Sequence, residues 1–398
     1  RLVEGDVGSG KTVVAAMAAI MVAASGKQTA FMAPTELLAR QHAETFHKVL
    51  APLGYDDKVA LLVGGMKQAE KKRVQAQVAS GKVQVIIGTH ALIQESVDMH
   101  NLALVVVDEQ HRFGVDQRKA LMGKAGTMPH VLSLTATPIP RSLALTLYGE
   151  LDISLLDVKP GGRQEVVTKI CSPNSRAQLY EKIEKELEAG RQMFVVCPLI
   201  SESSAQKMKS AEETFKEIQK AFKHRRVGLL HGRMKAAEKN DIMEQFVRHG
   251  IDILVSTTVI EVGVDVPNAS VMLVESAERF GLAQVHQLRG RVGRGGHKGY
   301  CYLMLSDSQA PSKRLRALES SNDGFRLAEL DLELRGPGAI YGSMQHGALD
   351  LRIANLSDVK LIAGARAAAK QFLESGEDLL QYKELHARVS KLRTVKRC

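Results

Sequence analysis

The chain has 398 residues, which at roughly 100–200 residues per domain suggests two or three domains. Its composition, 44% hydrophobic and 25% charged, is ordinary for a folded protein and excludes a disordered chain. The formal charge is +10 and most of the basic excess follows residue 157, which fits a polyanionic partner and, equally well, charge carried for solubility.

Short apolar runs alternate with helical patterns through the first half of the chain. Thr35–Leu50 has the pattern of a helix, with Thr35 as its N-cap. Alternation of β-branched strands with helices predicts a parallel sheet covered on both faces. The expected strands of this first sheet are Leu2–Val3, Thr29–Ala33, Val59–Val63, Val83–Ile87, Ala103–Val107 and Val131–Leu134.

The pattern pauses at Asp157–Arg163, where the run Lys159–Gly162 is typical of a linker, and then restarts. The expected strands of the second sheet are Gln192–Cys197, Val227–Leu230, Asp252–Ser256, Ser270–Val274 and Tyr300–Leu305. We therefore predict two tandem α/β domains over residues 1–157 and 158–311, of similar architecture but without a sequence repeat of fixed period.

After Ser306 the alternation of strands and helices stops, and residues 312–398 are predicted to form a third, helical part. The helices expected there are Lys313–Glu319, Gly324–Leu334, Leu356–Leu373 and Leu379–Leu392, with a Gly/Pro-rich loop after the second.

A phosphate-binding loop is predicted near the start of the chain. Gly5–Thr12 matches the pattern GxxxxGK[ST] without deviation and lies between a strand and a helix. The glycines Gly5, Gly8 and Gly10 let backbone amides, with Ser9, turn inward around phosphates. Lys11 would neutralise the β- and γ-phosphates, and the Thr12 hydroxyl would be a ligand of Mg²⁺.

Two carboxylates follow the apolar strand 104–107, namely Asp108 and Glu109. Both should lie at the carboxyl end of the sheet beside the phosphate loop. Asp108 would hold the Mg²⁺ shell, and Glu109 would orient and deprotonate the attacking water. An acidic strand end in contact with solvent is the alternative, but next to a phosphate loop the pair predicts ATP hydrolysis.

A basic, glycine-rich stretch in the second domain, 287–295, offers cations for the γ-phosphate. Arg291 and Arg294 are the candidate fingers, and such arginines are worth about 10³–10⁵ in rate. A contact with nucleic-acid phosphate and a solvated loop are the alternatives for this stretch. Which of the two arginines is the principal finger stays open.

In chain order, these blocks resemble the motifs of superfamily 2 helicases, and in particular the RecG family of branched-DNA translocases. The blocks are 5–12, 33–41, 88–91, 108–114, 134–141, 231–234, 256–267 and 287–294, followed by a segment from Ser321 to Gly338 that resembles the translocation motif of that family. The resemblance covers nearly the whole chain. It implies two RecA-like domains that bind ATP and Mg²⁺ between them, and a C-terminal helical hairpin that couples their movement to DNA.

The resemblance also implies roles for residues outside the phosphate loop. Further nucleotide contacts would come from Gly263, Asp265 and Gln287, and DNA contacts or coupling from Thr35, Thr89, Thr135, Thr137, Thr257, Thr258, Arg314 and Gln345. Thr135 and Thr137 would relay the state of the nucleotide, with strand-end capping as the alternative. The threonines that face DNA would hold phosphates, which gives no sequence preference.

The implied partner is branched or double-stranded DNA, with single-stranded DNA-binding protein as a further candidate, and the implied protein is a monomer acting at stalled forks and Holliday junctions. With no Trp and 4% aromatics, contacts to phosphates are favoured over base stacking. Four isolated cysteines suit a reducing cytosol, and no secretion signal is visible. No apolar run is longer than about a dozen residues, which excludes a membrane span. The resemblance implies a bacterial cytoplasmic protein associated with the nucleoid.

Two alternatives stay open. The transcription-repair coupling factor Mfd shares many of the same blocks, so a translocase module of that kind is the nearest one. From another class, the chain could be a nucleotide-dependent DNA-binding scaffold that hydrolyses little. The chain opens without Met four residues before Gly5, and the N-terminal wedge domain implied by the resemblance is not in it, so we interpret it as a motor fragment.

Overall fold

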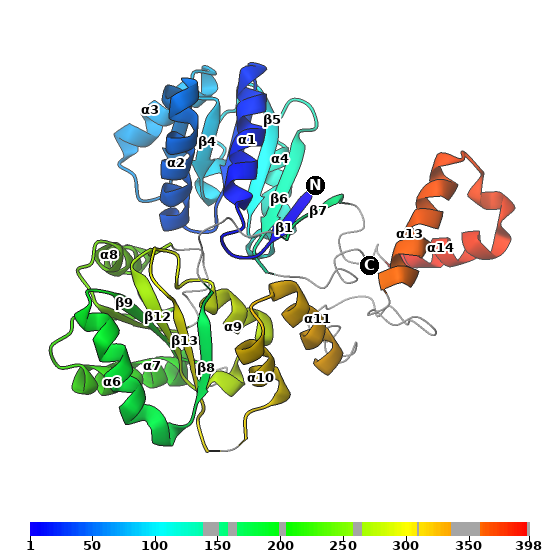
Figure 1. Ribbon diagram of the computed structural model, residues 1–398. Helices are drawn as coiled ribbons and strands as arrows, with labels where there is room; N and C mark the ends of the chain where they lie inside the picture. Colours follow the sequence, from blue (N-terminus) through cyan, green and yellow to red (C-terminus); the bar gives the residue numbers. More distant parts are fainter. Residues whose placement is uncertain are drawn as a thin grey trace. The chain divides into compact units, whose positions relative to one another are not determined.

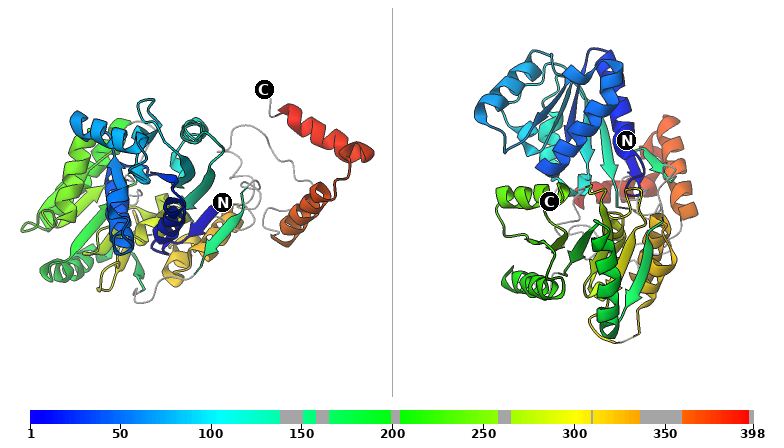
Figure 2. Two further views of the ribbon diagram at one scale, coloured as in Figure 1. Left: turned by 90° about the horizontal axis from the view of Figure 1, so that it is seen from above. Right: turned by 60° about the vertical axis from the view of Figure 1, so that its left-hand side comes forward.

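The structure, a computed structural model, describes residues 1–137, 151–157, 165–198, 204–257, 265–308, 310–335 and 359–395. The chain divides into two compact units. The first comprises Arg1–Pro138 with Ile153–Gly324, and the second comprises Ile139–Asp152 with Phe325–Cys398. The first unit contains two parallel sheets, drawn in blue to cyan and in green to yellow (Figure 1), and Figure 2 shows them from two further directions.

The first sheet and its helices, which we call lobe 1, carry the phosphate loop. Its seven strands lie in the order β3-β4-β2-β5-β6-β1-β7, and every pair is parallel. The strands are β1 (Leu2–Gly5), β2 (Gln28–Met32), β3 (Val59–Leu62), β4 (Val85–Gly88), β5 (Leu102–Asp108), β6 (His130–Thr135) and β7 (Ile153–Leu156). The helices are α1 (Lys11–Ala24), α2 (Glu36–Leu50), α3 (Gln68–Ala79) and α4 (Val115–Met122).

Both faces of the first sheet are buried, as alternate residues of β2 show. Phe31 lies in a buried cluster with α1 and α2, whereas Ala30 and Met32 lie in a second cluster with α3 and α4. Figure 1 shows α1 and α2 side by side over one face. Because successive side chains of a strand point to opposite faces, this two-sided burial explains the continuous apolar runs of the sequence.

The second sheet and its helices, which we call lobe 2, repeat this architecture. Its six strands lie in the order β10-β11-β9-β12-β13-β8, again all parallel. The strands are β8 (Val167–Cys171), β9 (Gln192–Val196), β10 (Val227–Leu230), β11 (Ile253–Ser256), β12 (Ala269–Val274) and β13 (Tyr300–Met304). The helices are α6 (Arg176–Glu188), α7 (Ser204–Ala221), α8 (Ala236–Val247), α9 (Leu282–Arg289) and α10 (Lys313–Ser320). Helices α6 and α7 pack on the same face of this sheet.

The two lobes share a strand–helix–strand unit at one edge of each sheet. Adding 168 to the bounds of β3, α3 and β4 gives the bounds of β10, α8 and β11. Lys71 and Lys239, which are 168 positions apart, each donate to a glycine carbonyl, Gly64 or Gly232, at 2.6 Å. Ten of the thirty residues from Val59 to Gly88 are identical to the residues 168 positions later. The expectation that the two halves share no sequence repeat of fixed period was therefore wrong for this segment.

The predicted strands are confirmed within one or two residues at each end. Two strands, β7 and β8, were missed. Their residues are mostly only partly buried, since each lies at the edge of its sheet, and they lack the long apolar run that marked the others. The predicted linker falls largely on 158–164, outside the described residues, so the boundary between the first two predicted domains stays a prediction.

Of the second unit, the structure describes three helices: α11 (Gly324–Arg335), α13 (Val359–Glu374) and α14 (Lys383–Val395). The three helices predicted after residue 320 are confirmed, although the last begins with a separate 3₁₀ turn, Leu379–Gln381. The rings of Phe372 and Tyr382 meet edge to face at 5.2 Å between α13 and α14. Throughout the described part of the chain, no helix combines the length and apolarity needed to cross a membrane.

Candidate functional site

The phosphate loop connects β1 to α1 as predicted. Gly8 and Gly10 have φ of +78° and +96°, values that L side chains adopt only with strain. Gly5 is fixed by a close approach instead, since a Cβ there would lie 2.9 Å from Cβ of Leu156. The three glycines are therefore required by the shape of the loop.

The side chains of the phosphate loop indicate that it binds an anionic ligand. The Nζ of Lys11 donates to the carbonyls of Gly5 at 2.7 Å and Asp6 at 2.8 Å. The hydroxyl of Ser9 is buried and has no hydrogen-bond partner among the described residues. Burial lowers the pKa of the Lys11 ammonium, and nearby carboxylates, Glu109 first, oppose that shift. A phosphate chain would give the hydroxyl a partner and the ammonium a counter-charge, so these residues fit a nucleotide.

Asp108 ends β5 and Glu109 follows it, at the carboxyl edge of the sheet where the phosphate loop also lies. The carboxylate of Asp108 accepts a hydrogen bond from Nε2 of His42 on α2 at 2.9 Å, and both side chains are buried. Burial alone would raise the pKa of Asp108, but the hydrogen bond and charge of His42 and the charge of Lys11 outweigh burial, and the pKa is lowered. Asp108 is therefore held as a carboxylate, the form that binds Mg²⁺.

The neighbouring carboxylate is shifted the other way. Burial, and then the charge of Asp108, raise the pKa of Glu109. Its backbone is left-handed, with φ of +49°, which is uncommon for a residue with a side chain and turns Glu109 out of the strand direction. Its Oε2 accepts from the amide of Ala136 at 3.3 Å. Two adjacent carboxylates with pKa values pushed apart suit two roles, a metal ligand and a base.

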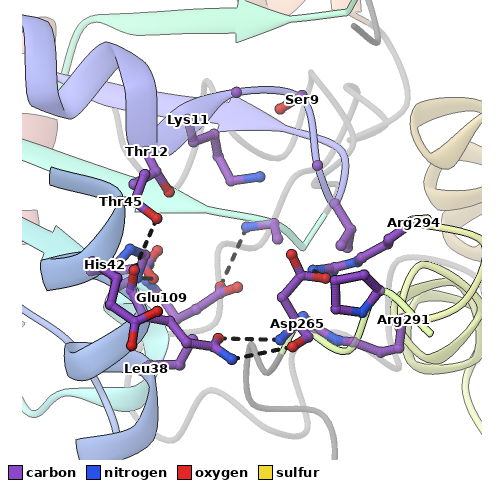
Figure 3. Close-up of a pocket in the computed structure, with 18 of the residues that line it drawn as sticks. Ser9, Lys11, Thr12, Leu38, His42, Thr45, Glu109, Asp265, Arg291 and Arg294 are labelled. Carbon is purple, nitrogen blue, oxygen red and sulfur yellow. Dashed lines mark hydrogen bonds and ion pairs between the residues drawn. The ribbon is translucent and has the colours of Figure 1, made fainter. Parts of the chain in front are cut away.

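Lobe 2 contributes the cations of the site. Arg291 and Arg294 line the same pocket of about 520 Å³ as Lys11 and Glu109, and Figure 3 shows all four side chains around it. Arg294 forms an ion pair with Asp265 at 3.0 Å, and its Nε donates to the carbonyl of Gly290. Burial, and then the charge of Arg294, lower the pKa of Arg291 to about 9. Arg291 is thus still a cation at neutral pH, with little surrounding water to screen it.

Asp265 also joins the lobes through its backbone. The side-chain amide of Gln41 donates to the carbonyl of Asp265 and accepts from its amide, both at 3.2 Å. Figure 3 shows this double contact at the edge of the pocket. The pocket is lined from lobe 1 by the phosphate loop, α1, α2, the end of β5 and the residues that follow β5 and β6. From lobe 2 it is lined by Val247, Asp265, Pro267 and the two arginines.

Gln287 does not line the pocket but contacts the end of β6 beside it. Its Nε2 donates to the hydroxyl of Thr137 at 2.6 Å. The hydroxyl of Thr135 accepts from the amide of Thr137 at 3.2 Å. The Thr135 hydroxyl therefore caps the strand end, and the Thr137 hydroxyl links it to lobe 2. Their predicted relay of the nucleotide state is untested.

The threonines predicted to hold DNA lie at element ends. Thr35 is the N-cap of α2, as predicted, and its hydroxyl accepts from the amide of Leu38 at 3.4 Å. Thr89 follows β4 and Thr257 follows β11, so the two occupy equivalent places in the repeated unit, and both are buried. The hydroxyl of Thr89 has no partner among the described residues. Thr258 and Gly263 lie outside the described residues.

Of the two residues predicted to couple domain movement to DNA, the structure describes one. The Nη2 of Arg314 on α10 donates to the carbonyl of Phe280 at 2.5 Å, which ties α10 to the turn before α9. Gln345 and the turn Gly336–Gly338 lie outside the described residues.

Several residues that form the site were not singled out from the sequence. His42 binds Asp108, Asp6 of the phosphate loop binds His286, and Arg289 binds the other side of that ring. A histidine on an amphipathic helix gives no sequence signal of its own. His42 and Asp108 are 66 positions apart in the sequence, and Asp6 and His286 are 280 apart, so only the tertiary structure brings each of these pairs together. His286 and Arg289 are neighbours on one helix, 3 positions apart.

Mg²⁺ would have few protein ligands at this site. No three His, Cys, Asp or Glu side chains gather as a metal site within the described ranges of the chain. Thr12 and Asp108 both line the pocket and come from different elements, Thr12 from the first turn of α1 and Asp108 from the end of β5. They could therefore share an ion with nucleotide phosphates, which is how Mg²⁺ is commonly held.

Comparison with known proteins gives three family matches in chain order. Residues 1–146 match the family described as DEAD/DEAH box helicase, and residues 176–296 match the helicase conserved C-terminal domain. Residues 321–397 match the family described as ATP-dependent DNA helicase RecG, domain 3, C-terminal.

Similar whole proteins carry the same name. The ATP-dependent DNA helicase RecG of Aquifex aeolicus is 48% identical over 394 residues, 97% of this chain and 49% of the relative. The protein of that name from Escherichia coli (strain K12) is 50% identical over 362 residues, 89% of this chain and 52% of the relative. The chain thus spans about half the length of the curated relatives it matches.

Solved structures agree with these matches. A structure of RecG bound to a three-way DNA junction has 46% identity and a TM-score of 0.75, and covers 91% of this chain and 47% of that one. Dbp5 of S. cerevisiae bound to RNA and ADP BeF3 has 16% identity and a TM-score of 0.58 over 84% of this chain and 83% of that one, and shares the fold alone.

Proposed function

Because the chain belongs to the RecG family of ATP-dependent DNA helicases, we propose that it is the ATP-hydrolysing motor of a branched-DNA helicase. One observation carries this proposal: Lys11, Glu109 and Arg291 from two lobes line one pocket. A site that only bound nucleotide would need the phosphate loop, but not a buried base and a buried cation from a second lobe.

Each residue of the pocket has a proposed role. The amides of the loop from Gly5 to Thr12, with the Ser9 hydroxyl, bind the phosphates, and Lys11 neutralises the β- and γ-phosphates. Asp108 and Thr12 hold Mg²⁺, which supplies charge neutralisation between the phosphates when bound. His42 keeps Asp108 ionised and oriented, as a partner of a metal ligand does.

Glu109 acts as the base that orients and deprotonates the attacking water. Its raised pKa makes the Glu109 carboxylate a stronger base than an exposed glutamate. Arg291 stabilises the charge that develops on the γ-phosphate. Arg294, paired with Asp265, holds the stretch 287–295 in place. We choose Arg291 as the principal finger because it lies close enough to Glu109 and Lys11 for their charges to act on one another.

The DNA side of the proposal rests on threonines at the ends of strands and helices. Thr35, Thr89 and Thr257, with Thr258, would hold phosphates at the carboxyl edges of the two sheets, where both buried threonines of the repeated unit lie. The fork and Holliday-junction substrates, the role in recombination and repair, the monomeric state, the bacterial cytoplasm and a single-stranded DNA-binding partner are part of the proposal.

The three-part organisation is likewise proposed: 1–157 and 158–311 as RecA-like domains, and 312–398 as the translocation segment. The match of residues 321–397 to the third RecG domain supports the last part. It also favours the RecG family over an Mfd-like module.

The test is steady-state ATP hydrolysis by the purified chain with Mg²⁺, with and without a three-way DNA junction. We expect turnover that the junction accelerates, and its loss in Lys11→Ala with unchanged thermal unfolding, because only a phosphate contact is removed. ATP binding without turnover in the parent chain would instead support the scaffold alternative and overturn the proposal.

A further inference from the structure

A buried histidine joins the two lobes beside the pocket. His286, on α9, lies 2.7 Å from Oδ1 of Asp6 in the phosphate loop, measured from its Nε2. Only 4% of the His286 side chain and 11% of the Asp6 side chain are exposed. One turn later, the backbone of Gly290 packs against Val7 of the phosphate loop, because a Cβ on Gly290 would lie only 2.8 Å from Cβ of Val7. The end of α9 is therefore packed directly against the phosphate loop.

The other ring nitrogen faces a cation. Nη2 of Arg289 lies 2.7 Å from Nδ1 of His286. Since a guanidinium can only donate, Nδ1 must accept, and the ring proton must be on Nε2, where it is donated to Asp6. The hydrogen-bond pattern thus assigns the neutral Nε2–H tautomer and places this ring between a buried carboxylate and a buried guanidinium.

Arg289 is held by backbone on its far side. Its Nη1 donates to the carbonyls of Leu318 at 2.8 Å and Ser321 at 2.7 Å, at the C-terminal end of α10. Burial lowers the pKa of the Arg289 guanidinium, while the thiol of Cys301 and the carboxylate of Asp6 oppose that shift. The hydrogen-bond partners of Arg289 are neutral groups, so Asp6 is the carboxylate that balances its charge, across the histidine ring.

Asp6 in turn shapes the loop that would bind phosphate. Its Oδ1 accepts from the amide of Val7 at 2.7 Å as well as from His286. Its carbonyl accepts from Nζ of Lys11 at 2.8 Å and from the amide of Ser9 at 3.1 Å. A displacement of Asp6 would therefore also move Lys11 and Ser9, the two loop residues proposed to contact phosphate.

We propose that His286 is a positioning residue for ATP hydrolysis, which fixes the phosphate loop through Asp6 and requires Arg289 to set its tautomer. This inference rests on the proposed ATPase function. Arg289 immediately precedes Gly290 and Arg291, and His286 lies about one helical turn before Gly290. The same contact therefore sets the position of Arg291 relative to Lys11. The Asp6–His286–Arg289 chain also links the phosphate loop to the end of α10, where the chain leaves the first unit.

The first test separates hydrogen bonding from shape. His286→Phe keeps a ring of similar size but removes donor and acceptor, and should lower kcat/KM for ATP by about 10- to 100-fold, the effect of one buried charge-assisted hydrogen bond. His286→Gln can accept from Arg289 and donate to Asp6, and should recover most of that loss. A parental kcat/KM in His286→Phe together with a loss in His286→Gln would mean that the ring only fills space.

The matched control is a second His–Asp pair of the same length. His47 Nδ1 lies 2.7 Å from Asp56 Oδ1, but within lobe 1 and with 42% of the His47 side chain exposed. His47→Phe should leave kcat/KM unchanged. A parent chain that turns over ATP, and a His286→Phe variant with the same kcat/KM as the parent, would overturn the inference without touching the proposed function.

A double-variant cycle tests the route through Asp6. If His286 acts through Asp6, then Asp6→Ala combined with His286→Phe should lose less than the product of the two single losses. A full product would show that the two residues act independently, and would overturn the proposed route.

A third readout does not depend on turnover. In the chain labelled with ¹⁵N-histidine, the His286 signals, identified by their absence in His286→Gln, should report the neutral Nε2–H tautomer at neutral pH. The Nδ1–H tautomer or a doubly protonated ring would overturn the assignment. If the parent chain hydrolyses no ATP at all, the proposed function fails, and this spectrum still decides the contact.

Discussion

The most exacting consequence of the site concerns Glu109. Glu109→Gln keeps an oxygen that can accept from the amide of Ala136 and removes one negative charge from a pocket that already holds Asp108. The change should remove the base and leave ATP binding intact. Loss of a general base is worth about 10²–10⁴ in kcat, or roughly 3–5 kcal/mol of transition-state stabilisation. KM should stay constant or fall, because the ATP phosphates meet one carboxylate fewer.

The raised pKa of Glu109 also predicts how kcat depends on pH. Burial and Asp108 raise the pKa of Glu109 from its ordinary value of 4.5, so as pH falls through the raised pKa the carboxylate gains a proton. The parent chain should therefore lose kcat on the acid side at a higher pH than an exposed glutamate would dictate. Asp108, whose pKa is lowered, stays ionised over the pH range in which Glu109 gains its proton. In Glu109→Gln, kcat should therefore show no such acid limb, that is, no fall on the acid side from this group.

The stability of the same variant follows from the same shift. A carboxyl whose pKa is raised in the folded state stabilises the fold below its unfolded pKa, and this contribution is lost as pH rises through the folded pKa. At pH 7.5, Glu109→Gln should thus unfold at the same or a higher temperature than the parent chain. A fall in kcat can then not be attributed to misfolding.

The assay is phosphate release under saturating and limiting ATP, from pH 5 to pH 9. Glu188→Gln, an exposed carboxylate on α6, is the control and should match the parent chain throughout. Turnover by Glu109→Gln at the parental rate, or persistence of the acid limb in this variant, would refute the assignment of the base.

Three further predictions concern other parts of the chain. Arg291→Ala should lower single-turnover hydrolysis by about 10³–10⁵-fold with little change in nucleotide affinity; a loss of affinity alone would assign the residue to binding. Gln192→Leu removes the amide that donates to the carbonyls of Phe246 at 2.6 Å and Ile251 at 2.7 Å. Two buried carbonyls without donors should cost about 2–6 kcal/mol in urea unfolding, and an unchanged midpoint would contradict this. Arg314→Ala should keep substantial DNA-dependent ATPase activity but lose junction unwinding in the full-length protein, and equal losses of both would count against a coupling role.

Much of the fold followed from local pattern. The strand beginning at Gln28 and the one beginning at Gln192 were predicted from apolar runs, which a strand buried on both faces requires. The short edge strands β7 and β8 carried no such run and were missed. That the two glutamines occupy the same place in the two sheets, each donating to two buried carbonyls, became visible only in three dimensions.

The candidate site, like the fold, has parts that the sequence predicted and parts that only the tertiary structure revealed. The sequence by itself determined the phosphate loop and the Asp108–Glu109 pair, because each is a run of adjacent residues whose chemistry depends on local backbone shape and on one strand end. It also determined that Arg291 and Arg294 were candidates for the finger, without deciding between them.

Only the tertiary structure decided how these parts meet. His42 reaches Asp108 across 66 residues, Gln41 reaches Asp265 across 224, and His286 reaches Asp6 across 280. No local pattern encodes such pairs, since each partner is also an ordinary polar residue of its own helix or loop. The His42–Asp108 pair depends on how α2 packs on the first sheet, and the other two pairs depend on how lobe 1 and lobe 2 pack together. Burial and these hydrogen bonds then produce the shifted pKa values and the tautomer from which we infer the chemistry of the site.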